Sequence, residues 1–362
     1  MHDRMFQHPR AKWVRRLMRI AALFLGAAAV MAQSREAFDL NEQALRAAEQ
    51  GDQAAAERLY HRAIDIWRSL GPDYQAHLGT TEYNLGQTLC ALGRRAEALP
   101  LVDHGLELLR ATLGLRHTNT LHAMNYVAGL RLMLGDAAGA EALFREALPV
   151  ERELFPKDTQ LALTLGGLSS ILVRQNKAAE ALPLAEEQLR IAIEAAGEQS
   201  LDAALAYGNV ATVHKWGRRY DLALPLYRKS LSIYEHLVGP EHPRTASVLS
   251  EIGLMEMEDG NYTLAERDMK QALDILGRPP GWNVEQWIGE TNLGILRFRE
   301  AKYAEAARWL ESSLRLQEEA GIREGGDLAV TLETLAKVRE KQRRFDDARQ
   351  LHERAAMVSA YR

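Results

Sequence analysis

The stretch LGQTLCALGRRAEALPL, residues 85–101, recurs along the chain in altered form. Three further stretches share its pattern, namely VATVHKWGRRYDLALPL (210–226), IGLMEMEDGNYTLAERD (252–268) and LGILRFREAKYAEAARW (293–309). In each stretch an apolar residue precedes a small residue, and an alanine follows that small residue by twelve positions. A constant period of this kind indicates a chain built from one repeated supersecondary unit.

These marker alanines divide the chain evenly. They recur at steps of 41 or 42 residues, at Ala56, Ala98, Ala140, Ala181, Ala223, Ala265, Ala306 and Ala348. We place eight units at residues 37–79, 80–120, 121–160, 161–202, 203–245, 246–285, 286–329 and 330–362.

Each unit is expected to fold as a hairpin of two helices. The small residue lies in the first helix, where another helix must approach closely. A break such as GRR or GNY follows, and glycine is common there because a helix ends most easily at a residue with positive φ. In the second helix, apolar and small residues follow the marker alanine by four and seven positions, which places them on one face. The sequence therefore predicts an all-α fold, an α-α superhelical solenoid of about eight hairpins with one continuous core.

The units resemble the tetratricopeptide repeat, and in particular the kinesin light chain group of that family. Their period of about 42 exceeds the usual period of about 34. The connectors LGLRHTNT (113–120) and LVGPEHPRT (237–245) are similar to that group's LGxxHPxT pattern. Because His117 and His242 recur at the same place in these connectors, we interpret them as turn residues. The resemblance implies a concave inner surface, lined by the first helices, that binds a protein or peptide partner.

The resemblance also selects candidate groove residues. Kinesin light chain repeats often carry an asparagine two positions before the small residue, where its amide binds a peptide main chain, since it donates and accepts hydrogen bonds. Asn84, Asn209 and Asn292 stand at that offset, and Asn125 is displaced by one position. The alternative is that these side chains bond only between neighbouring helices. The same register places further residues on or near the inner wall, namely Tyr83, Gln87, Thr212, Lys215, Trp216, Phe298 and Arg299.

Chemistry other than binding finds little support in the sequence. There is no G-x-S-x-G, P-loop or H-E-x-x-H motif. The single cysteine, Cys90, is expected to be a small buried or groove hydrophobe. We predict no catalytic residue, no cofactor and no metal site. The net charge of −4 offers no basic face for nucleic acid.

The N-terminus is predicted to be a secretory signal. Six basic residues precede the short apolar run IAALFLGAAAVMA, residues 20–32, and Val30 and Ala32 are small enough for cleavage after Ala32. A bilayer span needs about 20 apolar residues, so the run is short for a membrane helix. We therefore divide the chain into a signal peptide, 1–32, and a solenoid, 33–362, exported to the periplasm or secreted without a membrane span. An uncleaved anchor and a cytosolic amphipathic start are the alternatives.

The sequence thus supports the hypothesis of an exported, non-catalytic scaffold that holds an extended peptide or partner segment in its concave groove. One alternative is a cytosolic peptide-sensing regulator. Another is an accessory subunit that positions a separate enzyme. The sequence leaves the partner, the pathway and the oligomeric state open.

Overall fold

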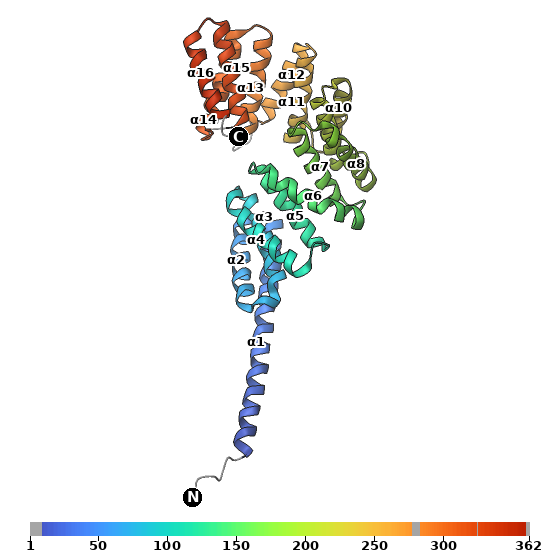
Figure 1. Ribbon diagram of the computed structural model, residues 1–362, viewed down its shortest axis with the longest axis vertical. Helices are drawn as coiled ribbons and strands as arrows, with labels where there is room; N and C mark the ends of the chain where they lie inside the picture. Colours follow the sequence, from blue (N-terminus) through green and yellow to red (C-terminus); the bar gives the residue numbers. More distant parts are fainter. Residues whose placement is uncertain (1–8, 277–282, 324, 360–362) are drawn as a thin grey trace. The chain divides into compact units, whose positions relative to one another are not determined.

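The structure is a computed structural model that describes residues 9–276, 283–323 and 325–359 (Figure 1). All regular elements in these residues are helical, sixteen α-helices and one short 3-10 helix. The all-α prediction is therefore confirmed. The chain divides into two compact units, Met1–Pro156 and Lys157–Arg362, called unit 1 and unit 2 below.

Unit 1 contains α1 (Pro9–Glu49), α2 (Gln53–Leu70), η1 (Pro72–Tyr74), α3 (Gln75–Ala91), α4 (Arg95–Leu113), α5 (Thr118–Met133) and α6 (Ala137–Leu154). Unit 2 contains α7 (Thr159–Arg174), α8 (Ala178–Ala196), α9 (Leu201–Trp216), α10 (Tyr220–Leu237), α11 (Pro243–Glu258), α12 (Tyr262–Leu276), α13 (Asn283–Arg299), α14 (Tyr303–Glu319), α15 (Gly326–Lys341) and α16 (Phe345–Ser359).

The helices pair into the predicted hairpins. Each odd-numbered helix packs against the even-numbered helix that follows it. Each marker alanine lies near the start of the second helix of its hairpin, and all eight are buried, with exposed fractions of 0% to 2%. The repeat register deduced from the sequence is therefore the register of the fold.

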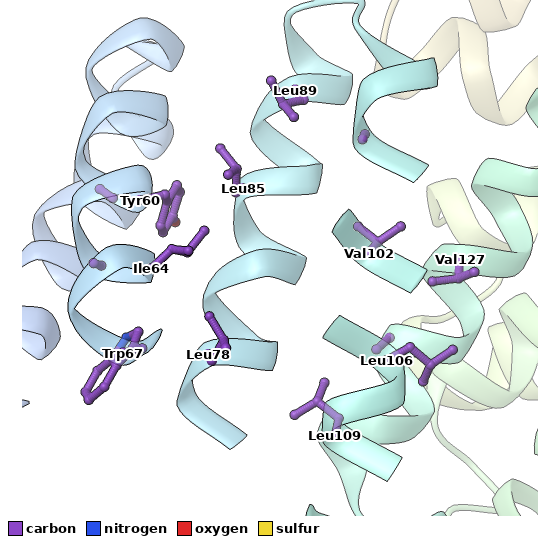
Figure 2. Packing of buried hydrophobic residues seen from close by; sticks show 14 of the residues in the cluster. Tyr60, Ile64, Trp67, Leu78, Leu85, Leu89, Val102, Leu106, Leu109 and Val127 are labelled. Atoms are coloured by element: carbon purple, nitrogen blue, oxygen red, sulfur yellow. The ribbon is translucent and has the colours of Figure 1, made fainter. Parts of the chain in front are cut away.

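Close approach of the paired helices depends on small residues. In unit 1, α3 and α4 meet at Gly79 and Gly105, where a Cβ atom on Gly105 would lie 2.7 Å from the carbonyl oxygen of Gly79. Larger side chains then fill the space between successive hairpins. Figure 2 shows this layer, in which Trp67 of α2, Leu85 of α3 and Leu109 of α4 are almost completely buried.

The connector histidines cap helices. The Nδ1 atom of His117 accepts a hydrogen bond of 3.1 Å from the backbone N–H of Asn119 at the start of α5. His242 makes the same bond, also 3.1 Å, to the N–H of Arg244 at the start of α11. A side chain that accepts from the first turn satisfies an N–H group that the helix itself leaves unpaired. The interpretation of both histidines as turn residues agrees with this geometry.

Helix α1 is longer than its hairpin partner and projects beyond it (Figure 1). In the part of α1 whose side chains are described, the first buried residue is Ala37, and residues 25–33 are all exposed. Ala37, Leu40 and Ala44 form the face that packs against α2. Over the described residues, the helices do not combine the length and apolar character needed to cross a bilayer.

Candidate functional site: a groove between α9 and α11

A cavity of unit 2 lies between two first helices, α9 and α11. Neighbouring first helices elsewhere in the unit, such as α7 and α9 or α13 and α15, contact each other more closely than α9 and α11 do. A cavity of about 320 Å³ opens in this space, with α10 as its floor. Its lining consists of Ala204, Leu205, Gly208, Asn209, Thr212, Tyr227, Ser230, Tyr234, Arg244, Ser247, Val248 and Glu251.

The floor of the cavity follows directly from the register of α10. Tyr227, Ser230 and Tyr234 stand four, seven and eleven residues after Ala223, a spacing that puts them on one helix face. The hydroxyl of Ser230 donates to the backbone carbonyl of Ala204, 2.7 Å away, and so ties α10 to α9. The two tyrosine rings provide an apolar surface with a hydroxyl on each.

The hydroxyl of Tyr227 is held inside the cavity. It lies 2.7 Å from the hydroxyl of Thr212 on α9, within hydrogen-bond distance. Burial raises the pKa of Tyr227 above its ordinary value, and the nearby Glu251 carboxylate raises it further. The phenol is therefore neutral at physiological pH and keeps a proton to donate.

Charged residues mark the two ends of this cavity. At one end the guanidinium of Arg244, in the first turn of α11, lies 6.0 Å from the ring centre of Tyr234, a cation–π distance. At the other end Lys215 of α9 forms an ion pair with Glu251 of α11 that bridges the two helices.

A second cavity, of about 300 Å³, lies beyond that ion pair. It is lined by Lys215, Trp216, Arg218, Tyr220, Leu254, Met255 and Glu258. Trp216, the last residue of α9, is 49% exposed, so much of its indole remains accessible. We refer to the two cavities and the ion pair between them as the α9–α11 groove.

The groove brings together four of the predicted site residues. Asn209 and Thr212 line the first cavity, and Lys215 and Trp216 line the second. Arg299 of α13 reaches its edge through an ion pair of 2.5 Å with Glu258. Asn292, on the same helix, is half-buried.

The other predicted site residues belong to unit 1. Tyr83 and Tyr126 meet edge to face with ring centres 5.3 Å apart, and the side-chain amide of Gln87 donates to the hydroxyl of Tyr83 at 2.8 Å. Asn84 is half-buried on α3, and Asn125 is buried on α5.

Two of the candidate asparagines make bonds between helices. The amide of Asn209 donates to the side-chain oxygen of Gln188 on α8 at 2.9 Å. The amide of Asn125 donates to the Glu151 carboxylate on α6 at 2.8 Å. Such bonds are those expected under the alternative that the asparagines bond only between neighbouring helices. A role for any of the four asparagines in ligand binding stays a prediction.

Sequence reasoning missed Leu205, Tyr234, Arg244 and Glu251 as groove residues. Glu251 stands two positions before the small residue of its hairpin, where other hairpins carry asparagine. The register therefore placed it on the groove wall, but only asparagine was sought there. Tyr234 extends the series that begins at Ala223 by one further turn. Arg244 falls within the stretch 237–245 that the sequence pattern assigns to a connector, where the pattern gives no direction for a side chain, whereas the structure places it in the first turn of α11.

Hydrogen bonding and apolar contact are the chemistry that this groove offers. In the part of the chain that the structure describes, three or more His, Cys, Asp or Glu residues do not gather in a group suited to a metal ion. Cys90 is half-buried on α3, in unit 1.

The geometry defines a class of protein, a solenoid of stacked helical hairpins with a groove along its first helices. The sequence pattern of the tetratricopeptide repeat matches residues 77–153, 202–278 and 288–356, more than half of the chain. The chain therefore belongs to the tetratricopeptide repeat family.

Comparison with known proteins gives one curated relative. The chain is 25% identical over 255 residues to kinesin light chain-related protein 1 of Arabidopsis thaliana, an alignment that covers 69% of this chain and 41% of that protein. The chain thus spans less than half of the length of this relative. The prediction of kinesin light chain-like repeats is confirmed at the level of the repeat family.

Solved structures with the same fold include two that align over more than nine-tenths of this chain. The apo form of the quorum sensor NprR from B. thuringiensis has a TM-score of 0.70 at 15% identity, covering 96% of this chain and 97% of its own. A Rap protein complexed with competence and sporulation factor has a TM-score of 0.61 at 14% identity, covering 92% and 98%.

Proposed function

We propose that this chain is a non-catalytic protein-binding scaffold, and that its α9–α11 groove receives a peptide or a segment of a partner protein. The observation that carries the proposal is the pair of cavities on the groove side of α9 and α11. Both combine an aromatic surface with a few polar groups that fix orientation, which is typical of binding sites. Membership of a repeat family that commonly binds proteins supports the same function.

We also propose that the protein is exported after cleavage behind Ala32. The exposed residues 25–33 of α1 and the first buried side chain at Ala37 support this boundary, because removal of residues 1–32 takes no described core residue from the first hairpin. The cut removes six basic residues and one acidic residue, so the net charge falls from −4 to −9. N-terminal sequencing of the protein from cell envelope or medium should begin at Gln33; an intact Met1 in the cytosol would favour the regulator instead.

The groove is tested by blocking it. Ser247 is exposed at the mouth of the first cavity, so Ser247→Trp should fill that mouth without entering the core. Ser232→Trp is the matched control, because Ser232 is an exposed serine on α10 that lines neither cavity. We expect phage-displayed random peptides selected on the wild-type protein to bind the Ser232→Trp variant equally and the Ser247→Trp variant at least tenfold more weakly.

Two results would count against the proposal. One is that selection yields no peptide whose binding depends on Ser247. The other is that both tryptophan variants bind the selected peptides as the wild type does. A requirement for a separate enzyme in the same complex would instead favour an accessory subunit.

A further inference from the structure

An exposed aliphatic side chain recurs at one register position along unit 2. It stands six residues before the small residue of the first helix. These side chains, called the aliphatic row below, are Leu163 of α7, Leu205 of α9, Ile288 of α13 and Val330 of α15, with exposed fractions of 51%, 41%, 37% and 48%. In α11 the position is Ser247, which interrupts the row.

The aliphatic row lies on the groove side of the first helices. Leu205 and Ser247 both line the first cavity, which fixes the direction of this register position in α9 and α11. The equivalent residues of α7, α13 and α15 occupy the same turn of the same repeated helix. Four large aliphatic side chains at equivalent exposed positions are more than the scattered surface apolar residues of an ordinary monomer.

The wall beside the aliphatic row is poorly suited to an extended main chain. An extended peptide must find partners for its N–H and C=O groups. The register position that would supply amides holds Gly167, Asn209, Glu251, Asn292 and Thr334 in the five first helices. Of these, Asn209 already donates to Gln188, and Glu251 is paired with Lys215. A bound helix needs no such partners on the groove wall, because its backbone N–H and C=O groups form hydrogen bonds with each other.

The spacing of the aliphatic row also favours a helix. Where neighbouring first helices contact each other, as α7 with α9 and α13 with α15 do, packed helices lie roughly 8–10 Å apart, so the two row residues of each such pair are presented about 10 Å apart. In an α-helix, residues seven apart lie on one face and are separated by about 10.5 Å. In a strand, same-face residues are separated by about 6.6 or 13 Å, neither of which matches the row.

Charge gives the orientation of the bound helix. The turn edge of unit 2, where the first helices end, carries exposed cations at Arg174, Lys177, Arg218, Lys341 and Arg343. Among the described residues, no carboxylate lies within ion-pair distance of any of the five. The turn after α11 differs, with Glu258 paired to Arg299 and Asp259 exposed beside it.

The distance from the row to this edge suits a helix as well. Eleven residues of a first helix separate the two, which is roughly 16 Å along its axis. A docked helix about 10–12 Å wide would span most of that distance and bring one flank within reach of the long cationic side chains.

We infer that unit 2 docks an amphipathic α-helix of a partner protein, with aliphatic residues seven apart on the aliphatic row and acidic residues facing the turn edge. The inference rests on the proposed function and specifies the partner's chemistry. The interruption at Ser247, Glu251 and Glu258 calls for a polar or basic residue at the corresponding turn of the partner helix.

The test uses the full-length protein and a phage-displayed library of random 30-residue peptides, because a helix rises 1.5 Å per residue and must span roughly 40 Å to reach from Leu163 to Val330. The selected sequences should show aliphatic residues at seven-residue spacing with an excess of Asp and Glu. Their synthetic forms should become more helical by circular dichroism when they bind. Fluorescence anisotropy should show at least tenfold weaker binding to a Leu163→Gln, Val330→Gln double variant.

A matched control keeps loss of folding apart from loss of binding. The Leu222→Gln, Leu264→Gln variant changes two leucines of similar exposure, 45% and 39%, on second helices outside both cavities. It should bind within twofold of wild type. The charge reversal Lys341→Glu should weaken binding of the acidic peptides at low salt and lose its effect at high salt.

The two proposals fail in different ways. Selected peptides that are proline-rich, that lack the seven-residue spacing, or that ignore the aliphatic row while Ser247→Trp abolishes their binding would overturn the helical partner and leave the groove intact. An absence of any peptide sensitive to Ser247→Trp would overturn both.

Discussion

Single small residues set how closely the helices of a hairpin approach. At Gly105 an added methyl group would meet backbone, the Gly79 carbonyl oxygen at 2.7 Å, and backbone cannot rotate away as a side chain can. At Gly129, in the middle of α5, nothing lies within 4 Å of the added atom. Close packing of the helices therefore requires glycine at position 105 but not at position 129, although both residues lie inside helices.

The first prediction compares these glycines. Gly105→Ala should lower the free energy of unfolding by about 1–3 kcal/mol, because overpacking outweighs the gain in helix propensity. Gly129→Ala should raise it by about 0.5–1 kcal/mol, because alanine loses less backbone entropy than glycine. Urea denaturation of both variants measures the difference. If both substitutions stabilise the protein, α3 and α4 do not approach as described.

A second residue-scale prediction concerns His352 in the last hairpin, where other hairpins carry an apolar or small residue. Its Nδ1 atom lies 2.8 Å from the Glu333 carboxylate and its Nε2 atom 3.2 Å from that of Glu340, both on α15. The bond to Glu333, and then that to Glu340, raises the pKa of His352 above its ordinary value, against the opposing effect of burial.

The direction of the pH dependence of stability follows from the raised pKa of His352. A raised pKa in the folded state gives a stabilisation that is complete below the unfolded pKa of about 6.5 and disappears as pH rises through the folded pKa. The stability of the wild type relative to a His352→Gln variant should therefore fall as the pH rises from about 6 through the raised pKa of His352. Denaturation series across this range measure the difference, and a difference that is independent of pH would contradict the assignment.

At the scale of the elements, one hairpin shows how an exception to the repeat is accommodated. The second helices carry a small residue seven positions after the marker alanine, but α8 carries Gln188 there. The facing residue on α7 is Gly166, where an added Cβ would lie 2.5 Å from the amide nitrogen of Gln188. The glutamine uses that space to reach Asn209 on α9. Gly166 and Gln188 thus form a coupled pair.

The third prediction is this coupling. Gly166→Ala should destabilise the wild type, but should be neutral or stabilising in a Gln188→Ala background, where the methyl group has room. The coupling free energy from the double-mutant cycle should be about 0.5–3 kcal/mol. Additive effects of the two substitutions would show that the side chains do not share this space.

The hairpins were predictable because their signal is periodic. Because the marker alanines repeat, each hairpin confirmed the register of the others. The shared register then fixed which face of each helix is buried. The groove was less predictable, since Tyr234, Arg244 and Leu205 owe their roles to the particular gap between α9 and α11. A repeat pattern describes what the hairpins share, whereas a site depends on where one hairpin differs, as Ser247 and Glu251 do.

At the scale of the whole molecule, the features described above lie in different compact units. Unit 1 carries the aromatic contact of Tyr83 and Tyr126, and unit 2 carries the α9–α11 groove and the aliphatic row. The central claim is that partners dock in unit 2 on the groove side of the first helices, and that the outer second helices do not take part.

Site-specific photo-crosslinking in the native host tests this claim most directly. A photoreactive p-benzoylphenylalanine placed at Leu205, on the groove side of α9, should form a covalent adduct with a partner segment that mass spectrometry identifies. The same amino acid at Leu222, which is similarly exposed on α10, should form none. Adducts of equal yield from both positions, or from Leu222 alone, would contradict docking in the groove.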